Sequence, residues 1–480
     1  MSISVLAIAG SLPVLVAFVL LVVLRWPAAR AMAVGWLLAS VLGLLFWRME
    51  PVWWIASSVY GGLQALEIII IVFGAILLMN HLERSGAVST LRWHFTQITE
   101  DRRVQLLLIG LGFVTLIEGA AGFGTPGALA APLMLGLGFP VLASAIFGLV
   151  FNATQPPFGA AGTPVIGGIG GVIDEAVLEA GIPLSGFLES VTVWTAVVTG
   201  LTFIFWGLLG VFLLVFWFGR EEERHVAAAL RATLSALPFA LLLGGLGGTT
   251  QLATAWLFGP ELPNIAAGFV VLGLGVALAR RGVLVPKEKW DFPERKSWPE
   301  TWLSDVARNS SDEEDASNET SPKKTMPLAL AWAPYLFVAL VLIVTRWPGL
   351  GVVDWMRERS LDIERILGTD LSFSLELLYL PGVIPFIPVA IITMLIHRMR
   401  LNAAIAAWGL TGRQILFPAV TLIVAVAMAQ VMIQSTTNPR GEPGMMEALS
   451  RVVAWGAGSL LPAVSPWIGT LGSFVVNLAL

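Results

Sequence analysis

The sequence predicts an all-α protein that crosses a lipid bilayer many times. Of its 480 residues, 56% are hydrophobic and only 12% are charged, and the mean hydropathy is +0.82. Because a soluble chain of this length carries about a quarter charged residues, the composition excludes an ordinary soluble enzyme and a disordered protein. Long apolar runs follow one another along the chain, and a helix needs about 20 such residues to cross the hydrocarbon core. We therefore expect a multi-pass protein of the cell membrane, with the lipid bilayer as its solvent.

The first apolar run, 3–24, is longer than the apolar part of a cleaved signal peptide, so we interpret it as a membrane helix. Further regular runs are 31–47, 52–80, 104–117, 139–155, 191–218, 232–258, 264–280, 328–345, 377–396 and 414–433. The stretches 118–138, 156–173 and 452–480 are apolar but interrupted by glycine and proline. Together these segments predict about 11–13 membrane elements.

A charged loop over residues 281–327 divides the chain. Its stretch from Asn309 to Ser321 has almost no apolar side chains, a composition that buries too little apolar surface to fold and predicts disorder. We interpret the loop as a solvated linker between the membrane halves 1–280 and 328–480, with a regulatory tail as the alternative. Helices, polar stretches and Gly-rich segments follow in the same order in both halves, as in secondary transporters built from repeats.

The residue types exclude several kinds of chemistry. A net charge of −4 offers no basic surface for nucleic acid, and the chain contains no cysteine. No Gly-Lys pair occurs, which excludes a Walker loop and an ATP-driven motor in this chain. His81, His94, His225 and His397 are far apart in sequence, so we expect surface or interface residues and no metal site. We therefore expect a protein that is not an enzyme and needs no cofactor.

The segment 115–173 contains two interruptions of an apolar helix. At the first, three glycines and Pro126 follow Glu118. At the second, Pro156 and Pro157 come directly after polar side chains. Broken backbone at membrane depth is tolerated only where protein or a wet cavity covers the freed N–H and C=O groups. Two such breaks can direct N–H groups and positive helix ends toward an anion.

Small and polar residues at the breaks form the predicted substrate site. They are Gly122, Gly124, Thr125, Asn152, Thr154, Gln155, Gly162 and Thr163. Because no Lys or Arg lies within 115–173, a carboxylate would be held by backbone N–H groups and by threonine hydroxyls, which favours a small monovalent anion. The alternative is that small residues only allow close helix packing, which explains the glycines but not the polar side chains.

Glu118 is the predicted proton-coupling residue. A charged carboxylate inside a bilayer is costly, so such a group protonates, pairs or faces water. A protonating carboxylate would carry a proton together with an anionic substrate, whereas the alternative is a structural carboxylate that accepts backbone N–H groups. Both interpretations remain open from the sequence. Glu67 also lies in an apolar run, but no motif surrounds it.

At these residues the chain resembles the L-lactate permease family. The similar segments are 118–126, 138–140, 158–164, 259–264 and 465–469, and the first is the most specific. The resemblance extends from the first helix to about Phe474. It implies import of lactate, glycolate or a related 2-hydroxy monocarboxylate together with protons.

The family in turn resembles the wider ion transporter superfamily, which implies inverted repeats with paired re-entrant hairpins. On that analogy, 118–138 is the first hairpin and 152–163 is the broken helix beside it.

The C-terminal part departs from the family pattern. Family members continue after the segment 465–469 into the tip of a second hairpin and further helices, whereas this sequence ends at Leu480. We therefore expect a family member truncated at the C-terminus. The primary hypothesis is a proton symporter, and the alternatives are a truncated and inactive family member, a passive anion channel or a membrane scaffold.

Overall fold

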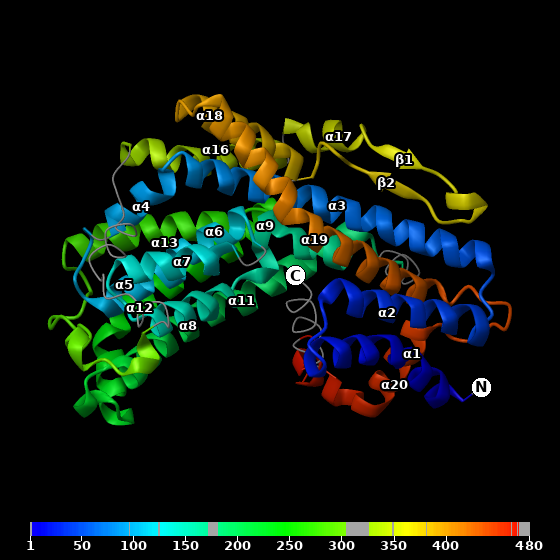
Figure 1. The fold of residues 1–480 in the computed structure, drawn as a ribbon, viewed down its shortest axis with the longest axis horizontal. Coiled ribbons are helices and arrows are strands. Elements are labelled where there is room, and N and C mark those ends of the chain that lie inside the picture. The colour runs from blue at the N-terminus through cyan, green and yellow to red at the C-terminus, as the bar shows by residue number, and fades with distance from the viewer. Residues whose placement is uncertain are drawn as a thin grey trace. The chain divides into compact units, whose positions relative to one another are not determined.

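The computed structural model describes residues 2–95, 97–122, 125–170, 181–303, 326–347, 350–380, 382–461, 463–467 and 469. Most of these residues lie in helices, which Figure 1 labels. Within the described ranges, nine helices are long and apolar enough to cross a membrane, and a bent helix pair raises the number to as many as ten. The predicted helical, multi-pass membrane protein is confirmed. The described residues add one small sheet, in which β1 (Leu361–Ile363) pairs antiparallel with β2 (Phe373–Leu375).

Some predicted membrane elements are not separate full spans. The segments 139–155 and 156–173 correspond to the bent pair, and 118–138 contains a helix of only 12 residues. The segment 377–396 gives an apolar helix that is too short to count as a span, and 452–480 is described only in part. Each shortened or bent segment contains proline or clustered glycine, which can interrupt the helical hydrogen bonds. Other spans accommodate an internal proline, such as Pro13 and Pro238, without being shortened.

The chain forms two compact units. Unit 1 consists of Met1–Phe73, Met356–Leu380 and Gly409–Leu480, and unit 2 of Gly74–Trp355 and Pro381–Trp408. Helices α3 (Pro51–Arg84) and α19 (Leu401–Gln434) contribute residues to both units. The division into the halves 1–280 and 328–480 remains a prediction.

Unit 1 packs α1 (Ile3–Phe18) against α2 (Ala28–Val41) and α20 (Met445–Ala457). π-Helical turns over Val19–Val23 and Leu42–Phe46 prolong the first two helices. A Cβ at Gly10 would lie 2.9 Å from the carbonyl oxygen of Met445, so the absence of a side chain allows the close approach of α1 and α20. The buried Trp47 donates from Nε1 to the carbonyl of Pro443 at 3.0 Å, which ties the C-terminal segment to α2.

Unit 2 contains the remaining helices. They are α4 (Ala87–Phe95), α5 (Arg102–Leu107), α6 (Thr115–Ala120), α7 (Thr125–Gly136), α8 (Val141–Asn152), α9 (Gly159–Thr163), α11 (Leu184–Phe218), α12 (Val226–Phe258), α13 (Pro263–Arg280), α16 (Leu328–Arg346) and α18 (Ile387–Ile396), together with most of α17 (Val352–Arg357). A π-helical turn over Leu108–Val114 joins α5 and α6 into one span, whose most apolar 18 residues are all buried. Helix α12 packs along both α11 and α13, and α13 packs on α6 (Figure 1).

The first part of the charged loop packs on unit 2, whereas 304–325 lies outside the described residues. Trp290, Phe292 and Trp302 are all more than nine-tenths buried. The rings of Phe139 and Phe292 meet edge to face with centroids 5.0 Å apart. Aromatic residues therefore anchor 281–303, although their neighbours along the chain are charged.

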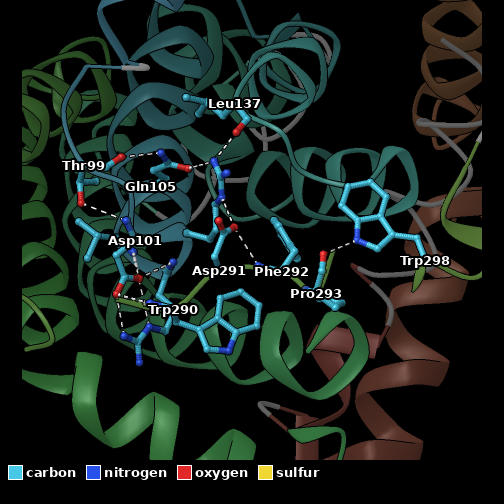
Figure 2. Close-up of polar contacts among 12 residues, drawn as sticks. Thr99, Asp101, Gln105, Leu137, Trp290, Asp291, Phe292, Pro293 and Trp298 are labelled. Atoms are coloured by element: carbon cyan, nitrogen blue, oxygen red, sulfur yellow. Dashed lines mark hydrogen bonds and ion pairs between the residues drawn. The ribbon is translucent and has the colours of Figure 1, made fainter. Parts of the chain in front are cut away.

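A buried ion pair holds this loop at the start of α5 (Figure 2). Asp101 accepts hydrogen bonds from the N–H groups of Arg103 and Trp290, at 2.9 and 3.2 Å. Its carboxylate also pairs with the Arg103 guanidinium at 2.6 Å, and both side chains are only 5% exposed. Arg103 further donates to the Glu288 carbonyl and to the Ser235 hydroxyl, each at 2.6 Å. The ion pair of Asp101 and Arg103, with its hydrogen bonds, therefore connects helix α5, the loop and α12.

We expect Asp101→Ala to lower the free energy of unfolding by about 3–5 kcal/mol, because it leaves the Arg103 guanidinium buried without its counter-charge. The detergent-solubilised protein should show a lower Tm. Glu100→Ala is the matched control, since Glu100 makes a largely exposed pair with Lys289 at 2.6 Å and such pairs contribute little. Equal changes in Tm for the two variants would contradict the argument.

Candidate functional site

The predicted break after α8 is present. Helix α8 ends at Asn152, a 3₁₀ turn covers Pro156–Phe158, and α9 and a π-helical turn over Pro164–Ile169 complete the element. The two parts are bent by 63°. The two prolines supply no N–H to continue α8, which accounts for the break at this point.

Helix α9 is a left-handed turn. Ala160, Ala161 and Gly162 have φ values of 40°, 50° and 75°. For residues with a side chain this conformation costs about 1–2 kcal/mol each, so the surroundings must hold it in place. Close backbone contacts do so: a Cβ on Gly162 would lie 2.5 Å from the carbonyl oxygen of Pro260, and one on Gly122 would lie 2.8 Å from the amide nitrogen of Ala160.

Glu118 faces this turn from α6. Its side chain is 3% exposed, and among the described residues its Oε2 atom has no hydrogen-bond partner. A Cβ at Gly159 would collide with the other carboxyl oxygen, so the carboxyl group lies directly against the start of α9. Thr115, one turn earlier on α6, is also buried with its hydroxyl unpaired within the described part of the chain. Helix α6 continues through Gly119 to Ala120, so Glu118 ends a full span, whereas we expected it to begin a hairpin over 118–138.

Asn152 lies at the last turn of α8 and faces α7. A Cβ at Gly127 of α7 would lie 3.8 Å from the Asn152 Cβ. The Asn152 Oδ1 atom is buried and has no partner among the described residues. A second unsatisfied acceptor is therefore present at the break.

Thr154 and Thr163 use their hydroxyl groups locally. The Thr154 hydroxyl donates to the Phe151 carbonyl at 2.7 Å, and the Thr163 hydroxyl donates to the Ala160 carbonyl at 2.6 Å. Each hydroxyl has one hydrogen, which the freed backbone carbonyls of the broken helix take. Both side chains therefore stabilise the break, and their hydroxyl oxygens remain as acceptors.

Gln155 joins a group of buried amides that the sequence analysis did not identify. Gln251 of α12 donates to the Gln155 Oε1 and the Asn264 Oδ1 atoms, both at 2.7 Å. Asn264 of α13 donates to the Gln155 carbonyl at 2.8 Å, and Thr199 of α11 donates to Gln251 at 3.0 Å. The available signal for Gln251 was an amide side chain inside the apolar run 232–258.

The structure gives less information on the other residues that the sequence singled out. Gly124 lies outside the described residues, and Thr125 begins α7. Glu67 is half buried on the part of α3 that belongs to unit 1. Among the described residues, no three side chains are grouped as metal ligands would be. His81 is buried within α3, where its Nδ1 atom lies 2.8 Å from the Leu77 carbonyl, so it is not on the surface, the first of the two placements (surface or interface) that we expected.

Comparison with known proteins identifies the family. The pattern that defines the L-lactate permeases matches residues 6–477. The chain belongs to the L-lactate permease family. It is a membrane transporter and not an enzyme.

Among the relatives of this permease, a putative L-lactate permease of Haemophilus influenzae is 26% identical over 96% of the chain. The glycolate permease GlcA of Escherichia coli K12 is 27% identical, and an L-lactate permease of Salmonella typhi is 24% identical, each over 98% of the chain. Each alignment covers 80% of the relative's own length. No solved structure matches the permease chain closely.

Proposed function

We propose that this permease imports L-lactate, glycolate or a related 2-hydroxy monocarboxylate together with a proton. The main support for this proposal is the buried Glu118 carboxyl, which lies against the broken helix with one oxygen unpaired among the described residues. The names of the relatives, lactate and glycolate permeases, support a small hydroxy acid as the substrate class.

The site residues in this proposal are those at the two breaks. Glu118 carries the proton, and the substrate lies among Gly122, Gly124, Thr125, Asn152, Thr154, Gln155, Gly162 and Thr163. The close backbone contact of Gly122 with Ala160 brings the segment after α6 next to α9, which supports a single site.

Proton and anion would stabilise each other in this site. A charged carboxylate without a partner is costly in a buried position, whereas the protonated group is neutral and can donate a hydrogen bond. A substrate anion next to Glu118 would favour protonation, because two neighbouring negative charges repel each other. The protonated carboxyl group could then donate to the anion, so that both cross the membrane together.

Uptake of labelled L-lactate into proteoliposomes tests the proposal. We expect accumulation when the outside is acidic and only equilibration without a proton gradient, with saturation as the concentration rises. Uptake without saturation or proton dependence would indicate a passive channel, and uptake equal to that of empty vesicles would indicate an inactive protein or a scaffold.

A further inference from the structure

We propose that Gln251 and Asn264 orient the Gln155 side chain so that its NH₂ group donates to an oxygen of the bound hydroxy acid anion. Gln251 and Asn264 act as positioning residues, and Gln155 is the group that contacts the substrate. The proposal rests on the proposed function, since it assigns roles within the same site.

The group joins four elements of unit 2. Gln251 and Asn264 have no exposed surface, Gln155 is 1% exposed and Thr199 is 6% exposed. Their hydrogen bonds are 2.7–3.0 Å long. Buried polar groups that are hydrogen-bonded in this way fix one arrangement, because a flipped amide would place a donor against a donor or an acceptor against an acceptor.

The amide orientations follow from one backbone group. The Gln155 carbonyl can only accept, so the Asn264 side chain must direct its NH₂ group there and its Oδ1 atom away. The Asn264 Oδ1 atom then requires a donor, so the Gln251 side chain must direct its NH₂ group toward this oxygen. The second hydrogen of the same NH₂ group meets the Gln155 side-chain oxygen.

The remaining end of this chain of hydrogen bonds is the Gln155 Nε2 atom. It is buried, and it has no hydrogen-bond partner among the described residues. A buried N–H group left unpaired is destabilising, so a ligand acceptor or an ordered water is required. The arrangement therefore holds a donor ready for an oxygen atom.

The position of this donor favours the substrate anion. Gln155 lies four residues before Gly159, which the Glu118 carboxyl contacts. A Cβ at Gly119, next to Glu118 in the chain, would lie 2.8 Å from the Asn264 Cβ. The two threonine hydroxyls of the broken helix already donate to backbone carbonyls, and 115–173 contains no Lys or Arg. A neutral amide donor is thus what the broken helix offers to a carboxylate or a hydroxyl oxygen.

A double-mutant cycle on the full-length permease tests the proposal, with initial rates of labelled L-lactate uptake as the readout. Gln155→Met should raise KM about tenfold or more, the loss expected when a hydrogen bond to a charged group is removed, and kcat should change little. Gln251→Met should raise KM similarly. In the double variant KM should not exceed that of the more affected single variant, because Gln251 acts through Gln155.

Thr199→Val and Thr192→Val are milder variants, which test the positioning role even if the methionine variants fold poorly. The Thr199 hydroxyl lies 3.0 Å from the Gln251 Oε1 atom and 2.9 Å from the Thr195 carbonyl, and these two acceptors share its one hydrogen. Thr192, on the same helix and also buried, donates to the Leu188 carbonyl at 2.6 Å and makes no contact with Gln251 among the hydrogen bonds of the described residues. We expect a higher KM only for Thr199→Val, with equal amounts of monodisperse protein in detergent.

Three results would overturn the positioning role: an unchanged KM for Gln155→Met, KM changes that multiply in the double variant, or equal KM values for the two threonine variants. None of these three results would contradict the proposed proton-coupled uptake by the wild-type protein. Absence of gradient-driven uptake by the wild type would instead remove the proposed function.

Discussion

Replacing Glu118 by glutamine is expected to abolish proton-driven accumulation of lactate without lowering the amount of inserted protein. The amide matches the protonated carboxyl in size and can donate a hydrogen bond, but it cannot release a proton. The variant should therefore still exchange labelled for unlabelled lactate across the membrane, because exchange needs binding and no net proton movement. The loss of accumulation should be complete, since the carboxyl lies buried against the broken helix.

The two assays use the same proteoliposomes, with an imposed pH difference for accumulation and with equal lactate on both sides for exchange. Glu189→Gln is the matched control, because Glu189 lies exposed on α11. It should leave both activities unchanged. Full accumulation by Glu118→Gln would show that the carboxylate is only structural.

Gly162→Ala is expected to abolish transport by displacing the left-handed turn. The neighbouring Ala160 and Ala161 already adopt positive φ, so the backbone conformation alone does not decide the result. The lack of space around Gly162 decides the result, because the added Cβ would lie 2.5 Å from the carbonyl oxygen and 2.8 Å from the Cβ of Pro260. Overpacking of this kind costs about 1–3 kcal/mol, and the left-handed conformation adds about 1–2 kcal/mol.

Gly168→Ala is the control for this prediction, since Gly168 lies in the π-helical turn of the same broken element and a Cβ there would meet no atom within 4 Å. Lactate uptake per folded transporter should be near wild type for Gly168→Ala and near background for Gly162→Ala. Similar uptake by the two variants would show that the contact with Pro260 is not required.

The membrane class and the position of the bent pair could be predicted from the sequence because both depend on local composition. Apolar runs predict spans, and Pro156 and Pro157 mark the break through a missing backbone donor. The analogy with the ion transporter superfamily placed Glu118 at the start of a hairpin over 118–138, but the buried helix continues through Gly119. Close packing against Asn264 and Ile265 leaves no room for a side chain at Gly119, which accounts for a glycine within the helix.

The amide group could not be predicted in the same way. Gln155 and Asn264 are 109 residues apart in sequence, and only the packing of α12 and α13 beside the broken helix brings them together. The local use of the Thr154 and Thr163 hydroxyls was equally hidden, since a threonine near a break is compatible with capping and with ligand binding. Long-range contacts determine which polar groups remain free.

The absence of Lys and Arg from 115–173 has a consequence for the electrical behaviour of transport. A membrane potential of 100 mV does about 2.3 kcal/mol of work on a unit charge that crosses alone. Under the proposed function, Glu118 is the one titratable side chain of the site, and a monovalent anion and one proton would cross as a pair with zero net charge. The voltage would then do no work on the pair, and the pH difference and the substrate gradient alone would set the direction of transport.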